Sequence, residues 1–492
     1  MDGTGDSASV PDSTKHRIVQ GVVPLHCSYF EVSPGMASLS SSYSSSECLC
    51  KIRIYNVSSG RGGLSLYKAP RGTSDILPEE QGYWRYIEDK AVALCRLYGY
   101  QRLDTPVFED FGLFARSIGD GTDIVTKEMY TFEDRSGNTL ALRPEGTAPV
   151  CRAYLEHGLA SMPQPVKLYY LAAIFRYERP QAGRYRQHYQ FGFEAIGDAD
   201  PVLDAEVIDM SWQFFRSLGL SQLCLHVNSI GCKTCRPAYL ESLKHYYSAR
   251  VVGLCSDCKT RIERNPLRLL DCKEPSCHDT AEAAPKSVDY LCQECKTHFE
   301  LVRRYLDTSK LPFVVNHRLV RGLDYYTKTV FEIQPPGEGA QNALGGGGRY
   351  DNLIEELGGK PTAAIGFAAG MDRVVLNLKR QEVPVPDLPR PEVFVARLGD
   401  EAKLEAIKLA SALRQDGIAV ATAIGDRSLK AQLRQANSLG SNYVAIIGEE
   451  EVKSGTVTLR NMTAGEQQVV SPSALGKLLQ ELHRSERNEQ GS

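Results

Sequence analysis

The sequence has no long apolar run and no excess of charge of one sign. Its most apolar stretches, such as Leu168 to Phe175, are short, and none approaches the ~18 residues that cross a bilayer. No membrane partner is therefore expected. Lys and Arg number 57 against 60 Asp and Glu, a net charge of −3, so an RNA partner must be held by local basic patches. The 492 residues, 42% of them hydrophobic, suit two or three domains.

Two kinds of catalytic motif are also missing. The chain contains neither a Gly-x-x-x-x-Gly-Lys-Ser/Thr phosphate loop nor a Ser/His/Asp or Cys/His nucleophile constellation. Cysteine, in contrast, is plentiful: there are 14, and eight of them fall between Cys232 and Cys295. Secreted disulfide scaffolds are small, so this clustering in a long chain indicates metal binding in a reducing compartment.

Residues 1–67 show no sustained helical or strand period and are rich in Ser and Gly. From Met36 to Arg71 the only acidic residue is Glu47. This composition is typical of a transit peptide and predicts a chloroplast or mitochondrial location, with Met36 as a hypothetical functional start. The alternative is a disordered tail, because three aspartates make the first 35 residues a poor targeting signal.

The next part, residues 68–382, is interpreted as an α+β catalytic domain. A helix is predicted from Trp84 to Tyr98. Turn-bounded strands are then expected at residues 101–108, 128–133 and 139–143, which favours an antiparallel sheet with flanking helices. A charged, Cys-bearing helical subdomain is inserted at about 228–312, and strands resume at 313–318 and 329–334.

A Pro-rich linker at residues 383–391 precedes a second domain at 392–485. Strands are predicted at 393–398, 418–424 and 443–448, with helices at 401–415 and 428–439 between them. This alternation is typical of a small α/β domain.

An arginine-rich loop is the first candidate for chemistry. The segments Phe175 to Pro180 and Gly183 to Gln187 place four arginines around a turn. Guanidinium groups bind phosphates in a bidentate manner, although the same charges also fit a solvated hairpin. The following strand alternates, so that Gln190, Gly192 and Glu194 share one face and could line a pocket.

Two glycine-rich elements follow, at Gly345 to Asp351 and Gly366 to Arg373. Glycine lets backbone approach a ligand closely, although each run taken alone also fits a turn or tight packing. Arg373 stands at the start of an apolar helix, where a charge needs a partner.

These motifs together resemble the signatures of class II aminoacyl-tRNA synthetases. Phe-Arg-Tyr-Glu-Arg-Pro resembles the second signature, Gly-Phe-Ala-Ala-Gly-Met-Asp-Arg the third, and the region through Thr105-Pro106 the first, which lies at the dimer interface in that class. Leu319 to Tyr326 and Gly-Gly-Arg-Tyr-Asp are similar to the signatures of the histidyl-tRNA synthetase family. The resemblance extends over roughly Pro70 to Ser471.

The resemblance implies a class II antiparallel sheet, an inserted helical subdomain and a C-terminal anticodon-binding domain. It also implies ATP with Mg²⁺, L-histidine and the tRNA for histidine as substrates, and a homodimer. Catalysis of adenylate formation requires mainly positioning and charge neutralisation, which agrees with the missing nucleophile.

Residue roles are carried over from the resemblance. Arg176 bridges the histidine carboxylate and the α-phosphate, Arg373 holds the γ-phosphate, and Arg321 stabilises the pentacovalent charge. Glu178 and Arg184 contact the nucleotide. Histidine itself is expected to meet Glu194, Tyr326 and the neighbouring Tyr325 at the imidazole, and Glu145, Thr147 and Gln190 at the α-amino group. A polar pocket of this kind rejects analogues strongly, because its own groups would be left unpaired.

The eight clustered cysteines have the spacing of structural zinc ligands. They are Cys232, Cys235, Cys255, Cys258, Cys272, Cys277, Cys292 and Cys295. Eight thiols suffice for one or two tetrahedral sites, but spacing does not fix their pairing. Unligated buried cysteines and redox-labile pairs are the alternatives.

In the C-terminal domain, Arg427, Lys430, Gln432 and Arg434 recur along one helix and could meet RNA phosphates or bases, or form a plain solvated face. Three rivals to the enzyme remain: a regulatory subunit of histidine biosynthesis or tRNA sensor, a class II synthetase for another amino acid, and a zinc-dependent RNA-binding protein. The first usually loses the histidine signatures, the Arg-Gly-Leu-Asp-Tyr-Tyr segment argues against the second, and the third leaves the arginine loop and Arg373 unexplained.

Overall fold

The computed structural model describes residues 67–490 apart from 120–121, 123, 182 and 336–342. The chain divides into two units, Met1–Leu66 and Tyr67–Ser492, and only the second is described. The predicted leader and Met36 therefore lie outside the described residues. Within those residues no helix is both long enough and apolar enough to cross a membrane.

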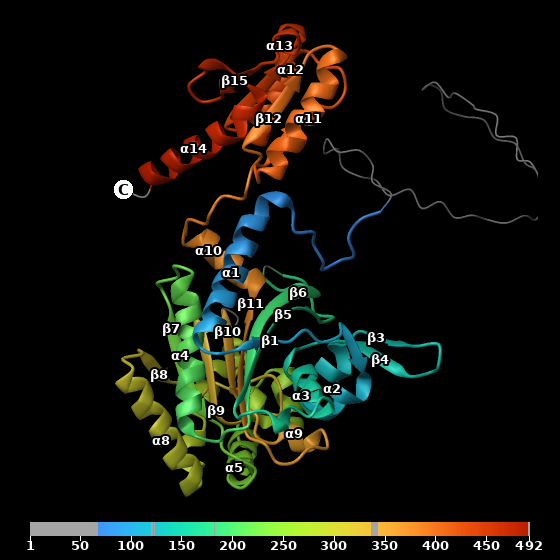
Figure 1. The fold of residues 1–492 in the computed structure, drawn as a ribbon. Coiled ribbons are helices and arrows are strands. Elements are labelled where there is room, and N and C mark those ends of the chain that lie inside the picture. The colour runs from blue at the N-terminus through green and yellow to red at the C-terminus, as the bar shows by residue number, and fades with distance from the viewer. Residues whose placement is uncertain (1–66, 120–121, 123, 182, 336–342, 491–492) are drawn as a thin grey trace, which may run out of the picture. The chain divides into compact units, whose positions relative to one another are not determined.

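An eight-stranded sheet forms the centre of the larger fold, in the order β1-β5-β6-β11-β10-β9-β7-β8 (Figure 1). The bounds are β1 Gln101–Arg102, β5 Val166–Phe175, β6 Gln187–Ile196, β7 Cys224–Ser229, β8 Phe313–Val315, β9 Thr327–Gln334, β10 Gly345–Arg349 and β11 Ala364–Gly370. The six central strands pair antiparallel, and only the edge strands β1 and β8 run parallel to their neighbours. The expected α+β class is confirmed.

The two faces of this sheet carry different helices. One face packs on α1 (Gln81–Leu97), α4 (Pro201–Ser217), α8 (Gln293–Thr308) and α10 (Met371–Arg380), through a core that includes Phe191, Phe193 and Phe367. The other face meets α3 (Thr147–Glu156), α5 (Arg236–Ser248), α6 (Ser256–Arg264) and α7 (Pro275–Glu282). Since side chains alternate along a strand, Gln190, Gly192 and Glu194, which alternate with the phenylalanines of β6, face this second side.

A three-stranded sheet of order β2-β4-β3 lies beside these elements, with β2 Phe108–Asp110, β3 Thr131–Glu133 and β4 Thr139–Leu142. The predicted single strand at residues 101–108 is wrong, because it divides into β1 and β2. Pro106 has no N–H for a ladder, and Arg143 binds the Thr105 carbonyl at 2.8 Å and the Pro106 carbonyl at 3.2 Å.

Two other predicted strands are shorter than expected. The strand expected at 128–133 begins at Thr131, since Ile124–Glu128 forms a π-helical turn, and the strand expected at 313–318 ends at Val315. The remaining short helices of this region are α2 (Phe111–Ile118) and α9 (Leu353–Glu356).

The C-terminal part has a five-stranded sheet of order β13-β12-β14-β15-β16. Its strands are β12 Val393–Arg397, β13 Val420–Thr422, β14 Tyr443–Ile447, β15 Val457–Asn461 and β16 Gln467–Val470, and its helices are α11 Glu401–Gln415, α12 Leu429–Leu439, α13 Glu449–Ser454 and α14 Pro472–Gln490. The parallel strands β13, β12 and β14 agree with the predicted α/β alternation. The antiparallel hairpin β15-β16 was not predicted.

Gln432 does not have the exposed position that an RNA contact requires. Its side chain is buried, and its amide group bonds to the backbone of Arg397 and of Arg427 at 2.7–2.9 Å. The expectation for Gln432 is therefore wrong: this residue holds α12 against β12. Arg427, Lys430 and Arg434 are exposed.

Candidate active site

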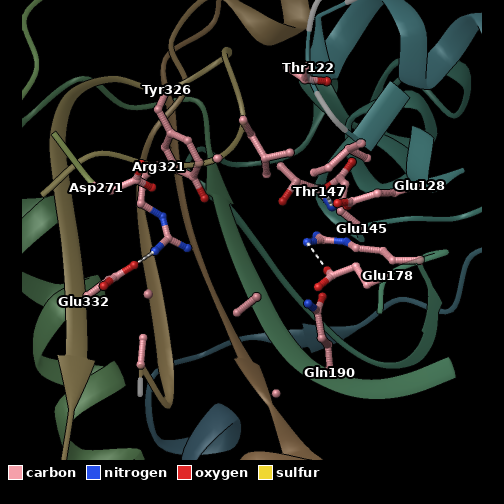
Figure 2. Close-up of a pocket in the computed structure, with 18 of the residues that line it drawn as sticks. Thr122, Glu128, Glu145, Thr147, Glu178, Gln190, Asp271, Arg321, Tyr326 and Glu332 are labelled. Carbon is pink, nitrogen blue, oxygen red and sulfur yellow. Dashed lines mark hydrogen bonds and ion pairs between the residues drawn. The ribbon is translucent and has the colours of Figure 1, made fainter. Parts of the chain in front are cut away.

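A cavity of about 1200 Å³ opens on the second face of the large sheet. Every residue predicted to bind histidine or ATP lines it. These residues are Glu145, Thr147, Arg176, Glu178, Arg184, Gln190, Glu194, Arg321, Tyr325, Tyr326 and Arg373. Figure 2 shows Arg321, Tyr326 and Glu332 along one side of the cavity and Glu145, Thr147, Glu178 and Gln190 along the other.

Glu194 is the most deeply buried of the glutamates predicted to bind histidine or ATP. It projects from β6 with 1% of its surface exposed, and its two oxygens accept hydrogen bonds from Thr147 Oγ1 at 2.8 Å and Tyr350 Oη at 2.6 Å. Burial raises the pKa of Glu194 to about 8, and the nearby Glu145 carboxylate adds to the rise. A ligand N–H group that donates a hydrogen bond to Glu194 would reduce the free-energy cost of ionising this carboxyl group.

Close backbone approach makes room for this carboxyl. A Cβ atom on Gly366 of β11 would lie 1.6 Å from Glu194 Oε2. Gly366, in the second glycine-rich element, therefore accommodates the Glu194 side chain. This is the tight packing given above as the alternative to ligand contact.

Glu145 is fixed by the start of α3. Its carboxylate accepts the backbone N–H groups of Thr147 at 2.6 Å and Ala148 at 2.8 Å. The side chain is 3% exposed, and burial raises its pKa. Since a carboxylate has about four acceptor sites, Glu145 can still accept from a ligand amine.

Several guanidinium groups converge on the cavity. Arg176 follows β5 and donates through Nε to the Pro144 carbonyl at 2.7 Å, and Arg184 pairs with Glu178 at 3.1 Å. Arg186 of the same loop instead stacks on Tyr177, 3.6 Å from the ring centroid. Burial, followed by the charge of Arg176, lowers the pKa of His188 to about 3, so this imidazole is neutral near pH 7. The local field thus favours an anionic ligand.

Arg373 is held by backbone alone. Its Nε donates to the Gly183 carbonyl at 3.2 Å and its Nη1 to the Ala343 carbonyl at 2.9 Å. Burial and then repulsion by Arg184 lower its pKa. Among the described residues Arg373 forms no ion pair with a carboxylate, so its charge remains available to an anion.

Comparisons with known proteins decide the family. The family model described as histidyl-tRNA synthetase matches residues 72–234 and 259–374, and the anticodon binding domain model matches 392–482. A histidine–tRNA ligase of Dehalococcoides mccartyi is 62% identical over 397 residues, which cover 81% of this chain and 95% of the relative. The chain belongs to the histidyl-tRNA synthetase family.

Further relatives of this histidyl-tRNA synthetase agree with the assignment. A histidine–tRNA ligase of Desulforamulus reducens is 50% identical over 402 residues, covering 82% of this chain and 96% of the relative. The solved structure of apo S. aureus histidyl-tRNA synthetase superposes with a TM-score of 0.71 at 38% identity, covering 84% of this chain and all of that one. The chain is an ATP-dependent aminoacyl-tRNA ligase that joins histidine to its tRNA.

The predicted chloroplast or mitochondrial location is wrong. Eight histidine–tRNA ligases that are 48–62% identical to this chain all come from bacteria, and these relatives contradict the predicted location. The acid-poor, Ser-rich leader was read as a transit peptide from composition alone, and composition does not distinguish such a peptide from an untargeted tail.

The cavity of the synthetase also contains polar residues that the sequence motifs did not single out. Tyr350 and Glu332 contact the predicted residues Glu194 and Arg321, and Arg264, Arg268 and Lys273 of the insertion line the same cavity. Tyr350 lies within the Gly-Gly-Arg-Tyr-Asp run, so the sequence motif could have indicated it as a residue of the site. For Glu332 the sequence offers only the alternation of side chains around Phe331 in β9. For the three basic residues of the insertion, the residue spacing gives no indication that they line the cavity.

Proposed function

We propose that this cavity forms histidyl-adenylate and then transfers the histidyl group to tRNA. In the first step a histidine carboxylate oxygen attacks the α-phosphorus in line, and pyrophosphate leaves with the electrons of the broken P–O bond. In the second step a ribose hydroxyl at the tRNA 3′ end attacks the carbonyl carbon, AMP leaves, and the hydroxyl proton is released. The observation that carries this proposal is the placement of buried Glu194 and the four assigned arginines, Arg176, Arg184, Arg321 and Arg373, around one cavity.

Histidine binds at the Glu194 end of the cavity. Glu194 and Tyr326 contact the two imidazole nitrogens, with Tyr325 packed beside Tyr326 at a ring centroid distance of 4.8 Å. The α-amino group binds Glu145, just before α3, Thr147, at the start of α3, and Gln190 of β6, which supply acceptor oxygens.

ATP binds along the arginines. Arg176 bridges the histidine carboxylate and the α-phosphate, Arg373 holds the γ-phosphate, and Glu178 and Arg184 contact the nucleotide. Among the described residues Arg373 forms no ion pair with a carboxylate, so its guanidinium can bind an anionic phosphate directly, which supports this role.

Magnesium accompanies ATP in this family, and the donor set of the cavity fits it. Mg²⁺ binds through phosphate oxygens together with one or two carboxylates. Glu128 and Glu178 line the cavity on the side of Glu145 (Figure 2) and are the residues that would hold it. The ion supplies charge neutralisation at the phosphates.

Further parts of the proposal concern the whole molecule. Residues 68–382 form the catalytic domain, with the insertion at about 228–312; residues 383–391 are the linker; and 392–485 bind the anticodon through Arg427, Lys430 and Arg434. The enzyme is a homodimer that uses the region through Thr105-Pro106, as the class signature implies.

The experiment that tests the catalytic proposal is amino-acid-dependent exchange of pyrophosphate into ATP by the full chain, with all twenty amino acids compared. Exchange with histidine alone is expected. If a folded preparation showed no exchange, the adenylation proposal would be overturned in favour of a regulatory subunit.

Replacing Arg373 with alanine is expected to raise KM for ATP by about tenfold or more, since a charge-assisted contact contributes roughly 1.5–3 kcal/mol. The dissociation constant of histidine should stay within about twofold, because Arg373 is assigned only to the γ-phosphate. The control is Arg179→Ala, an exposed arginine of the loop between β5 and β6 that does not line the cavity. Equal effects of the two variants on KM would remove the assignment.

A further inference from the structure

The eight clustered cysteines separate into two compact groups in space. One contains Cys232, Cys235, Cys292 and Cys295, and the other contains Cys255, Cys258, Cys272 and Cys277. Within each group all four sulfur atoms lie within 4.8 Å of one another, and among the described residues no carboxylate or imidazole belongs to either group. Sequence spacing had left the pairing open, and the fold resolves it by bringing the 232–235 knuckle to the start of α8.

The sulfur geometry matches a tetrahedral metal site. Sulfur–sulfur distances are 3.8 Å from Cys232 to Cys235, 3.9 Å from Cys232 to Cys292 and 3.8 Å from Cys255 to Cys272. A Zn–S bond of about 2.3 Å places the sulfurs of a regular tetrahedron about 3.8 Å apart. All eight thiols are free of disulfide bonds.

The backbone around the sulfurs has the form of a metal-binding knuckle. The N–H of Cys232 donates to Cys235 Sγ at 3.3 Å, and the N–H of Cys258 donates to Cys255 Sγ at 3.4 Å. Gly231 has φ +72°, and a Cβ there would lie 2.7 Å from Cys235 Sγ. Hydrogen bonds to sulfur stabilise a thiolate, and glycine is required at this turn.

The first cysteine group holds one end of a cavity-lining segment. Arg236, directly after Cys235, donates to the Tyr326 carbonyl, and Glu294, between Cys292 and Cys295, pairs with Lys328 at 3.0 Å. The Lys328 N–H also donates to the Gly231 carbonyl at 2.9 Å. The backbone at Tyr326 to Lys328 is thus attached to this group.

The second cysteine group holds the other end of the same segment. Between Cys258 and Cys272, Asn265 donates to Asp324 at 3.0 Å and the Leu270 carbonyl accepts from Arg318 Nε at 3.2 Å. His278, next to Cys277, lies 3.1 Å from Arg318 Nη1. Arg321, Tyr325 and Tyr326 therefore lie on a segment that is anchored near both groups.

We propose that the two cysteine groups are independent tetrathiolate zinc sites and that they brace the Arg318–Lys328 segment of the active site from its two ends. Each site binds one Zn²⁺ through four thiolates, and the thiol protons are released to solvent. Soft sulfur ligands in a closed tetrahedron select zinc for a structural role. The family-model match stops at residue 234 and resumes at 259, so Cys235, Cys255 and Cys258 lie between the matched parts, whereas the other five cysteines lie within them.

The first test is the metal content of the full chain purified under reducing conditions. Two zinc ions per chain are expected. The double variants Cys232→Ser/Cys292→Ser and Cys255→Ser/Cys272→Ser should each retain one, and the control Cys224→Ser, in β7 outside both groups, should retain two. Should a double variant fail to fold, the native chain loaded with cobalt should show thiolate-to-cobalt absorption that saturates at two ions. No metal, one ion per chain, or iron in place of zinc would overturn the proposal.

The second test concerns bracing and rests on the proposed role of Tyr326 in histidine binding. Arg236→Met should retain two zinc ions yet raise KM for histidine by about tenfold, with KM for ATP nearly unchanged, as expected for a residue that orients a binding group. Lys244→Met, an exposed α5 residue paired with Glu263, is the matched control. An unchanged KM for histidine in Arg236→Met would overturn the bracing role. The zinc content is measured without an activity assay, so its outcome does not depend on whether the proposed function is correct.

Discussion

Replacing Arg321 with alanine is expected to slow histidyl-adenylate formation about 100- to 1000-fold, the usual loss when a donor to developing charge is removed. Arg321 reaches the cavity from the segment before β9, pairs with Glu332, and lies 5.6 Å from the Tyr326 ring centroid. Its Nε has no hydrogen-bond partner among the described residues. A guanidinium held in this way is already oriented before the α-phosphate gains its fifth oxygen.

The decisive measurement separates rate from binding. The single-turnover rate of adenylate formation should fall by the stated factor, while the dissociation constant of histidine changes by about threefold at most, since Arg321 is assigned to charge that appears only in the transition state. The rate of adenylate formation by Arg321→Lys should lie between those of the wild type and Arg321→Ala, because lysine keeps the positive charge but lacks the planar, bidentate guanidinium group. Equal losses of rate and affinity would show that Arg321 acts in ground-state binding instead.

Replacing Glu194 with glutamine is expected to weaken histidine binding about 10- to 100-fold, because a charge-assisted hydrogen bond of roughly 1.5–3 kcal/mol becomes a neutral one. Affinity for ATP should change little. Calorimetric titration with each ligand measures both effects. Glu156→Gln, an exposed carboxyl of α3 paired with Arg152, is the control and should leave both affinities unchanged. Histidine binding of wild-type strength in Glu194→Gln would exclude the imidazole contact.

The same variant tests the ionisation of Glu194. Its pKa is about 8 in the fold and about 4.5 when unfolded, so between these values the folded chain binds more protons than the unfolded chain. The contribution of Glu194 to stability is therefore complete below about pH 4.5 and is lost, at about 1.4 kcal/mol per pH unit, as pH rises toward 8. Glutamine does not ionise. Without histidine, the difference in thermal midpoint between Glu194→Gln and the wild type should increase as the pH is raised from about 5 to about 8. A difference that does not change with pH would contradict a buried Glu194 with a raised pKa.

Much of the candidate site could be predicted from sequence because its residues lie in short, dense motifs. The alternation around Phe191 and Phe193 placed Gln190 and Glu194 on one face of a strand, and that face lines the cavity. Arg373 was singled out because a charge at an apolar helix start needs a partner. Among the described residues its hydrogen-bond partners are backbone carbonyls, and no carboxylate lies within ion-pair distance.

Other features depend on contacts between distant segments, which local patterns do not record. The cysteine spacing shows four short pairs, but only the fold joins Cys232 with Cys292 and Cys255 with Cys272. Gln432 has the sequence position of an exposed residue, yet it is buried because two stretches of backbone converge on its amide. The break between β1 and β2, in contrast, has a local signal in the sequence, because Pro106 has no N–H with which to complete a strand ladder.

The strand order has a consequence for how the enzyme is made on the ribosome. β10 and β11 are the last strands of the large sheet to be synthesised, yet they lie in its middle, between the β1-β5-β6 half and the β9-β7-β8 half. A nascent chain that ends before Ala364 therefore presents two half-sheets with unpaired inner edges, which are prone to pairing with other chains. The catalytic sheet can close only after its final strand, β11, has left the exit tunnel, so these inner edges stay unpaired while most of the chain is being synthesised.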